Sequence, residues 1–562
     1  MLLQIKDLHK SIGNKTLYSN LDLILNESEK TALIGRNGTG KTTLLNIIAS
    51  NDTDFEGSVE KSSGLSIVLT QQEHFLGEDL QPDTTPLDYI LDSVPQYSLL
   101  QRVIRKHENS KNYDQEYLEA IDTYTELGYY TVEDEILSTL ASFQIDEDKA
   151  LSSILSLSGG EKRFVELTRV MFSNAQLALI DEPTNHMDTV GKQKFLEWMN
   201  QFNKTLLIIT HDRDVLHHVN KIYELKDQNI STYRGNYEHY LRQNAIETIT
   251  LVHSYETDSK RIDKIKKQMN DAKEKKLSAK SDKGRDRAKQ LEERFKREYQ
   301  KLKETLKKPS FWIDAETEKN LPDQLKDLYK EYKSQNIQLK QDSSTKQVQR
   351  LLLQINKVTL GYDCPLFSPI DFDVFEGDRI NLQGRNGIGK TTFLKYLIKK
   401  IEAEDLNGNI KNYSGSIEVK RSIKLGVYKQ EVDTTDLDLS LWDGIEKILK
   451  ENEMPVNDQK VIQLLRMYLF NVELHSKTNI RELSGGEKAR FQLMKMLMKK
   501  PDILILDEPT NHLDLPSIEE LENFLDDFAG AIIYVSHDSY FAKNMGGNVV
   551  SLSPHKSERI CL

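Results

Sequence analysis

The sequence has very little cysteine and no long apolar run. Its 562 residues include only two cysteines, Cys364 and Cys561, too few for a disulfide framework or a zinc site built from several cysteines. No stretch approaches the roughly 18 consecutive apolar residues that a membrane-spanning helix needs. The first residues, Met1 to Asp7, carry charges where a signal peptide has an apolar segment, and they predict a β-strand instead. These absences predict a cytoplasmic protein without a membrane-spanning part.

An internal repeat organises the chain. Five segments of the first half recur in the same order in the second half: Leu3–Ile5 as Leu353–Ile355, Gly35–Thr43 as Gly384–Thr392, Leu157–Lys162 as Leu483–Lys488, Asp181–Asp188 as Asp507–Asp514, and Thr210–Asp212 as Ser536–Asp538. Such a repeat predicts two homologous domains, at 1–240 and 351–562, joined by a linker at 241–350. Apolar runs such as Leu177–Ile180 and Leu206–Ile209 alternate with helical segments. This alternation predicts an α/β fold with a largely parallel sheet covered on both faces.

The linker differs from both domains in charge. The net charge of the chain is −12, yet residues 257–308 hold 20 Lys and Arg against 10 Asp and Glu, which leaves −22 on the rest. Apolar residues in two stretches recur at steps of three and four, with Ser281–Gly284 between them, and predict an antiparallel helical hairpin with a basic tip near Lys273–Lys289. A charged hairpin can also be a solvated spacer with no partner.

Both domains contain a phosphate-binding loop. Gly35–Thr42 and Gly384–Thr391 match G-x-x-x-x-G-K-[ST], and the first follows the predicted strand Ala32–Ile34. Backbone N–H groups of such a loop surround the phosphates of ATP, the lysine reaches the β- and γ-phosphates, and the Thr hydroxyl ligates Mg²⁺. The predicted nucleotide-binding residues of the two loops are Gly35, Asn37, Gly38, Gly40, Lys41, Thr42, Thr43, Gly384, Asn386, Gly387, Gly389, Lys390, Thr391 and Thr392.

Acidic residues and a histidine follow the next apolar runs in each domain. Asp181 and Asp507 end predicted strands, where a carboxylate can hold Mg²⁺ together with Thr42 and Thr391. Glu182 and Glu508 follow them and are predicted to polarise the attacking water. His211 and His537 each follow another strand and precede an aspartate, which favours a sensor of the γ-phosphate over a core histidine.

At this point the sequence resembles the ATP-binding cassette (ABC) ATPases. Leu157–Glu161 and Leu483–Glu487 look like the ABC signature, which other phosphate-loop families lack. The resemblance implies that the domains face head to tail, so that Ser484, Gly485 and Gly486 complete the site of Lys41. Ser158, Gly159 and Gly160 complete the site of Lys390.

The same resemblance implies three further positions. A glutamine that ligates Mg²⁺ is assigned to Gln430 in the second domain and to Gln72, with Gln71 as the alternative, in the first. An aromatic residue ahead of the loop stacks on adenine; Tyr362 has this place in the second domain, whereas the first has Ile12. We therefore expect weaker adenine stacking at the first site.

Two complete cassettes, a basic helical linker and the segments Glu182–Asp188 and Glu508–Asp514 resemble the ABC-F family over the whole chain. The family implies a monomer that closes its own cassettes on ATP and binds the ribosome, with the linker reaching rRNA and P-site tRNA. ATP hydrolysis then drives release. The role is either general translation or protection of the ribosome from peptidyl-transferase antibiotics, and the long linker slightly favours protection. The alternatives are the ATPase subunit of a transporter, which requires a membrane partner, and a DNA-binding ATPase.

The first domain carries an insertion. From Gln72 to Leu157 there are 85 positions, against 53 from Gln430 to Leu483, so about 32 extra residues lie near 92–148. They resemble the arm by which ABC-F proteins contact ribosomal components. A loop insertion without a partner is the alternative.

Overall fold

In the computed structural model, both halves of the chain build a mostly parallel sheet from the short apolar runs. The structure describes residues 1–13, 15–70, 83–107, 115–157, 159–185, 187–278, 282–305, 350–402, 410–420, 423–428, 434–483, 485–511 and 513–555. Both cassettes belong to one compact unit, and the described residues between 238 and 305 belong to a second.

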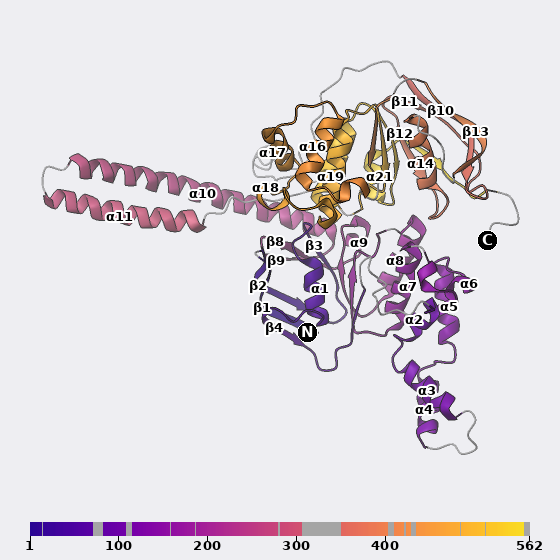
Figure 1. Ribbon diagram of the computed structural model, residues 1–562. Helices are drawn as coiled ribbons and strands as arrows, with labels where there is room; N and C mark the ends of the chain where they lie inside the picture. Colours follow the sequence, from indigo (N-terminus) through magenta and orange to yellow (C-terminus); the bar gives the residue numbers. More distant parts are fainter. Residues whose placement is uncertain are drawn as a thin grey trace. The chain divides into compact units, whose positions relative to one another are not determined.

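The central sheet of the first cassette has the order β5-β6-β7-β3-β8-β9, in which β8 and β9 are antiparallel and the other neighbours are parallel. A second, antiparallel sheet has the order β2-β1-β4 (Figure 1). The strands are β1 (Leu3–Ile12), β2 (Lys15–Leu25), β3 (Lys30–Gly35), β4 (Glu56–Lys61), β5 (Ile67–Leu69), β6 (Leu177–Asp181), β7 (Thr205–Ile209), β8 (Lys221–Lys226) and β9 (Asn229–Arg234). Every residue of β6 and β7 is buried, as continuous apolar strands require.

The second cassette repeats this plan, with parallel strands in the order β14-β15-β16-β12-β17 and an antiparallel sheet β11-β10-β13. Its strands are β10 (Leu351–Gly361), β11 (Ile370–Phe375), β12 (Arg379–Gln383), β13 (Lys411–Val419), β14 (Leu425–Tyr428), β15 (Ile503–Asp507), β16 (Ala531–Val535) and β17 (Asn548–Ser551). The predicted class, two tandem α/β cassettes joined by a helical linker region, is confirmed.

Helices cover the sheets and bring the motifs to the strand ends. In the first cassette they are α1 (Lys41–Ala49), α2 (Pro86–Leu91), α3 (Tyr97–His107), α4 (Gln115–Glu126), α5 (Val132–Ser142), α6 (Glu147–Ala150), α7 (Gly159–Phe172), α8 (Thr189–Gln201) and α9 (Arg213–His217). In the second they are α14 (Lys390–Ile401), α15 (Thr434–Leu437), α16 (Leu441–Glu451), α17 (Asp458–Met467), α18 (Val472–His475), α19 (Gly485–Met498), α20 (Leu515–Asp527) and α21 (Ser539–Met545).

The insertion of the first cassette contains the helical pair α3 and α4. Residues 452–457, which join α16 to α17 in the second cassette and are all described, hold no helix. The pair is lined by contacting tyrosines, with the rings of Tyr97 and Tyr129 and of Tyr124 and Tyr129 packed edge to face. The bounds 92–148, like the domain bounds at 240 and 350, stay predictions.

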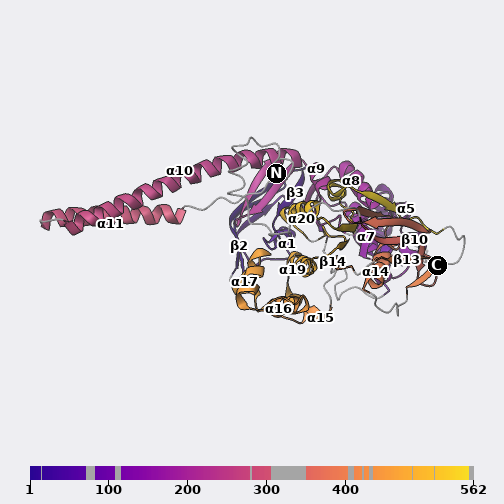
Figure 2. The same cartoon turned by 90° about the horizontal axis from the view of Figure 1, so that it is seen from above.

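The linker contains α10 (Tyr237–Ser278) and α11 (Asp282–Thr305), which lie side by side in both views (Figures 1 and 2). Arg261 of α10 and Glu298 of α11 form an ion pair of 3.4 Å. Ile265 is buried, whereas Lys264 and Lys266 beside it are exposed. The predicted turn at Ser281–Gly284 is wrong in part, since α11 already begins at Asp282. An acidic side chain there suits the positive end of a helix dipole.

No helix in the described part of the chain is long and apolar enough to cross a membrane.

Candidate nucleotide sites

Each phosphate-binding loop leads from a strand into a helix, as predicted. In the first cassette the loop follows β3 and α1 begins at Lys41; in the second it follows β12 and α14 begins at Lys390. The Nζ atom of Lys41 donates to the carbonyl oxygens of Gly35 at 2.7 Å and of Arg36 at 3.2 Å. Lys390 makes the matching bonds within its own loop at the same two distances. Both ammonium groups are thus held by the first two carbonyl oxygens of their own loops.

The loop glycines are required by conformation and by space. Gly40 has φ 102° and Gly389 has φ 105°, values that L side chains rarely adopt. A Cβ on Gly40 would also lie 2.7 Å from the hydroxyl oxygen of Tyr18. Tyr18 donates its hydroxyl to the Gly40 carbonyl, while Phe367 packs against Gly389 in the second cassette.

The predicted Mg²⁺ ligands meet at the ends of strands β6 and β15. The Thr42 hydroxyl donates to a carboxylate oxygen of Asp181 at 2.7 Å, and Thr391 hydrogen-bonds Asp507 in the same way. The remaining predicted ligands, Gln72 (or Gln71) and Gln430, lie outside the described residues. Hydroxyl and carboxylate oxygens are the ligands that Mg²⁺ prefers, so these side chains would hold the ion, which would supply positive charge to stabilise the charge that develops on the phosphates.

The predicted base and sensor lie together in each cassette. Glu182 and Glu508 have φ of 46° and 49°, a left-handed conformation rare for glutamate. Their N–H groups donate to the neighbouring strand, at Ile209 and Val535. His211 Nε2 lies 3.7 Å from a Glu182 oxygen, and His537 Nε2 lies 3.3 Å from a Glu508 oxygen.

Burial shapes the protonation of these groups. It raises the pKa of Glu182 to about 8, with repulsion from Asp181 adding to the rise and the charges of Lys41 and Arg163 opposing it. It raises the pKa of Glu508 to about 7. Burial, assisted by the positive charge of Lys41, lowers the pKa of His211 to about 3, so this imidazole is neutral. A carboxyl with a pKa near neutrality is suited to accept a proton from water.

The surroundings of His211 support its predicted role as a sensor of the γ-phosphate. Both ring nitrogens of His211 are buried and have no hydrogen-bond partner among the described residues. A buried polar group is normally satisfied, so the single ring N–H of this neutral imidazole fits a phosphate oxygen arriving beside Lys41. The donors present therefore fit ATP with Mg²⁺.

An aspartate from each cassette reaches the loop of the other. Asp514 accepts from the backbone N–H of Asn37 at 3.4 Å, and Asp188 accepts from the N–H of Asn386 at 3.3 Å. With its other oxygen each aspartate caps its own helix, Asp514 from Ser517 N–H at 3.1 Å and Asp188 from Gly191 N–H at 2.8 Å. Both aspartates end the repeated segments Asp181–Asp188 and Asp507–Asp514, but nothing in those short motifs indicates a contact with the other cassette.

The signature residues are described only in part. Gly159 and Gly160 open α7, and Gly485 and Gly486 open α19. Ser158 and Ser484 lie outside the described residues. The adenine side is also incomplete: Tyr362 is 43% exposed with its hydroxyl 3.3 Å from that of Thr392, whereas Ile12 in the first cassette is 56% exposed. Stacking by Tyr362 stays a prediction.

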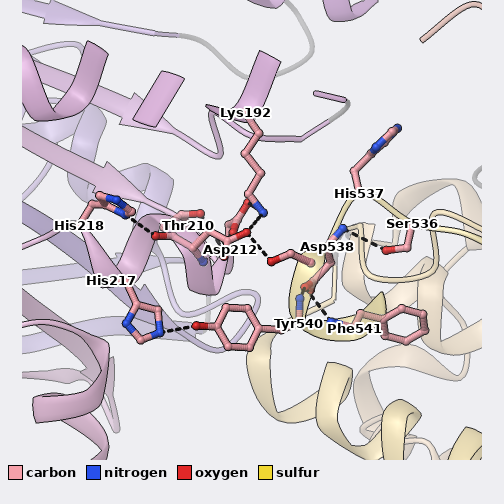
Figure 3. Close-up of polar contacts among 12 residues, drawn as sticks. Lys192, Thr210, Asp212, His217, His218, Ser536, His537, Asp538, Tyr540 and Phe541 are labelled. Atoms are coloured by element: carbon pink, nitrogen blue, oxygen red, sulfur yellow. Dashed lines mark hydrogen bonds and ion pairs between the residues drawn. The ribbon is translucent and has the colours of Figure 1, made fainter. Parts of the chain in front are cut away.

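A second set of contacts joins the cassettes directly after the two histidines. His217 and Tyr540 point toward each other, 2.6 Å apart between Nε2 and the hydroxyl, with their rings stacked (Figure 3). The Ser539 hydroxyl donates to Asp214 at 2.7 Å. Arg213 pairs with Glu522 at 3.2 Å, and both side chains are at least nine-tenths buried. We call these residues the post-histidine seam.

The fold and the loops together define a tandem nucleotide-binding protein with two cassettes. The model of the ABC transporter family matches residues 18–185 and 367–511, and a second model described as ABC transporter matches 223–312. The putative ATP-binding protein YdiF of Bacillus subtilis is 31% identical over 98% of this chain and 80% of its own length.

Two further relatives also match almost the whole of this chain. The ribosome protection protein VmlR of Bacillus subtilis is 27% identical over 98% of this chain and 86% of its own. The ATP-binding protein Uup of Escherichia coli is 26% identical over 95% and 77%. Among solved structures, the archaeal ribosome recycling factor aABCE1 in complex with a stalk protein aligns with a TM-score of 0.58 at 15% identity, covering 98% of this chain and 88% of that one. That likeness shows the fold alone. The chain belongs to the ABC-F family of ATP-binding cassette ATPases.

Proposed function

We propose that the protein hydrolyses ATP at two composite sites and binds the ribosome while its cassettes are closed on ATP. The observation that carries the composite sites is the reciprocal contact of Asp514 with the loop of Lys41 and of Asp188 with the loop of Lys390. Since each loop is bounded by the other cassette, ATP bound there is held from both sides. Hydrolysis removes the γ-phosphate and releases the closure.

Within each site we propose the following roles. The lysine and the loop N–H groups would hold the phosphates, and the paired side chains Thr42 with Asp181 and Thr391 with Asp507 would hold Mg²⁺. Glu182 or Glu508 accepts a proton from water, whose oxygen bonds to the γ-phosphorus as the bond to the bridging β–γ oxygen breaks and ADP leaves. A neutral His211 donates to the γ-phosphate.

We propose the ribosome as the partner because the helical hairpin carries an excess of positive charge. The basic side chains of residues 257–308 sit on a chain that is otherwise strongly acidic, and those of α10 that flank Ile265 are exposed. Lys and Arg bind RNA phosphates and displace counterions. The name of the relative VmlR supports the same partner. We propose that α10 and α11 contact rRNA and P-site tRNA, in general translation or in protection from antibiotics.

The test uses Glu182→Gln/Glu508→Gln, which keeps ATP bound but removes both proposed bases. This variant is sedimented with ribosomes in ATP, in ADP and without nucleotide, each at low and high salt. We expect retention in ATP only, weakened by salt. Lys41→Ala/Lys390→Ala is the matched control and should not be retained. Absence of retention in every condition would remove the ribosome from the proposal and favour a membrane or DNA partner.

A further inference from the structure

The signature helices of the two cassettes place an arginine at different positions. Aligning Leu157 with Leu483 sets Arg163 opposite Ala489 and Phe164 opposite Arg490. The arginine of the first cassette therefore lies one residue earlier. One residue turns a side chain by about 100° around a helix, so the two arginines face different surroundings.

The side chain at the later of the two positions packs against a phenylalanine ring in both cassettes. In the second, Arg490 lies over the ring of Phe470 at 5.0 Å and donates to the carbonyl of Leu469 at 3.0 Å. In the first, Phe164 stacks on Phe143 with ring centres 4.7 Å apart. An aromatic pair in the first cassette thus takes the place of the cation–π pair in the second.

Arg163, one residue earlier on the signature helix α7, reaches the end of strand β6. Its guanidinium donates to the carbonyl oxygen of Asp181, the residue before Glu182. Its charge also acts on the Glu182 carboxylate. Glu182 is held in a left-handed conformation, and the peptide that joins it to Asp181 is now fixed from two sides, by Arg163 at the carbonyl and by Ile209 at the Glu182 N–H. Rare backbone conformations persist only where the surroundings hold them.

We propose that Arg163 is a positioning residue for Glu182, and that the two ATP sites turn over unequally because the second cassette has Ala489 in its place. The inference rests on the proposed function, in which Glu182 acts on water. Ala489 has no side-chain donor, so the carbonyl of Asp507 receives no equivalent bond from this position of α19. The asymmetry lies in the chemical step rather than in adenine binding.

Single-turnover hydrolysis of bound ATP, read one site at a time, tests this. Glu508→Gln leaves the first site active and Glu182→Gln leaves the second. In the first background Arg163→Ala should slow the chemical step by about tenfold, the scale of one charge-assisted hydrogen bond, with half-saturation by ATP unchanged. Arg163→Lys, which keeps the charge and one donor, should recover part of the rate. In the second background Arg163→Ala should leave the rate unchanged.

The second site is a control for distortion of helix α7. Helix α7 also carries Gly159 and Gly160, which are proposed to serve the second site, so mere distortion of α7 would slow that site. Slowing of the second site alone, or of both sites equally, would overturn the inference. An unchanged rate at the first site would do the same while leaving the proposed function standing. A lack of hydrolysis in the unmodified protein would overturn both.

Discussion

The buried pair of Arg213 and Glu522 offers a quantitative test of the post-histidine seam. Its two charges, 3.2 Å apart, come from different cassettes and are 5% and 9% exposed. Removing one partner of a buried pair leaves an uncompensated charge, at a cost of about 3–5 kcal/mol of unfolding free energy. Replacing both partners avoids that penalty, so the two single substitutions should not add up in the double variant.

The two single substitutions should differ in size. After Arg213→Ala, Glu522 keeps a bond from Asn544 at 3.0 Å but still faces Asp538. After Glu522→Gln, Arg213 remains over the Tyr540 ring and near Asp538. We therefore expect a loss of about 3 kcal/mol for Arg213→Ala, roughly half of that for Glu522→Gln, and a coupling of at least about 1 kcal/mol in the cycle.

The pH dependence supplies an independent readout. Burial raises the pKa of Glu522, and Arg213 opposes the rise, so Arg213→Ala should raise the pKa of Glu522 further. A carboxyl with a raised pKa in the folded state binds a proton on folding, so stability falls as pH rises through that pKa. The deficit of Arg213→Ala should thus be largest near pH 8 and shrink toward pH 5.

Urea unfolding of the four proteins of the cycle at both pH values measures these quantities. The expected non-additivity and the expected pH dependence both follow from one desolvated ion pair. Single substitutions that add up, together with a stability deficit that does not change with pH, would therefore refute the reasoning.

Three further predictions concern single sites. In Asp514→Ser the serine can still cap α20 but is too short to accept from the N–H of Asn37. ATP binding at the Lys41 site should weaken by about 3–10-fold in an equilibrium assay. Equal weakening at both sites would contradict the cross-cassette contact. The pKa of Asp436 is held below its usual range because the bonds from Lys447 and Lys495, at 2.7 and 2.5 Å, outweigh burial. Asp436 therefore stabilises the fold above about pH 4, and this effect is lost as pH falls through its folded pKa. Asp436→Asn should lower the unfolding free energy by about 2 kcal/mol at pH 7 in denaturant unfolding, and a loss that persists at pH 3 would be inconsistent with this cause. Tyr18→Phe removes the bond to the Gly40 carbonyl and should lower unfolding free energy by about 1 kcal/mol, and an unchanged urea midpoint would show that the bond contributes nothing.

The sequence by itself determined the features that rest on local chemistry. The two loops, the strand-terminal acids and the histidines are short motifs whose glycine conformations and apolar neighbours are encoded within a few residues, and their repetition established two cassettes. The charge and helical period of the linker were equally local. The exact start of α11 at Asp282 was not, because a Gly–Asp–Ser cluster permits either a turn or a helix start.

Only the tertiary structure decided which residues meet across the cassettes. Asp514 contacts the loop at Asn37 from 477 positions away, and no local preference encodes that distance. Arg163 and Arg490 look like a shifted copy of one residue in sequence, yet a one-residue step around a helix sends one to Asp181 and the other to Phe470. Motifs specify the chemistry of each half-site, whereas the packing of helices and loops around them decides how the halves are paired and how they differ.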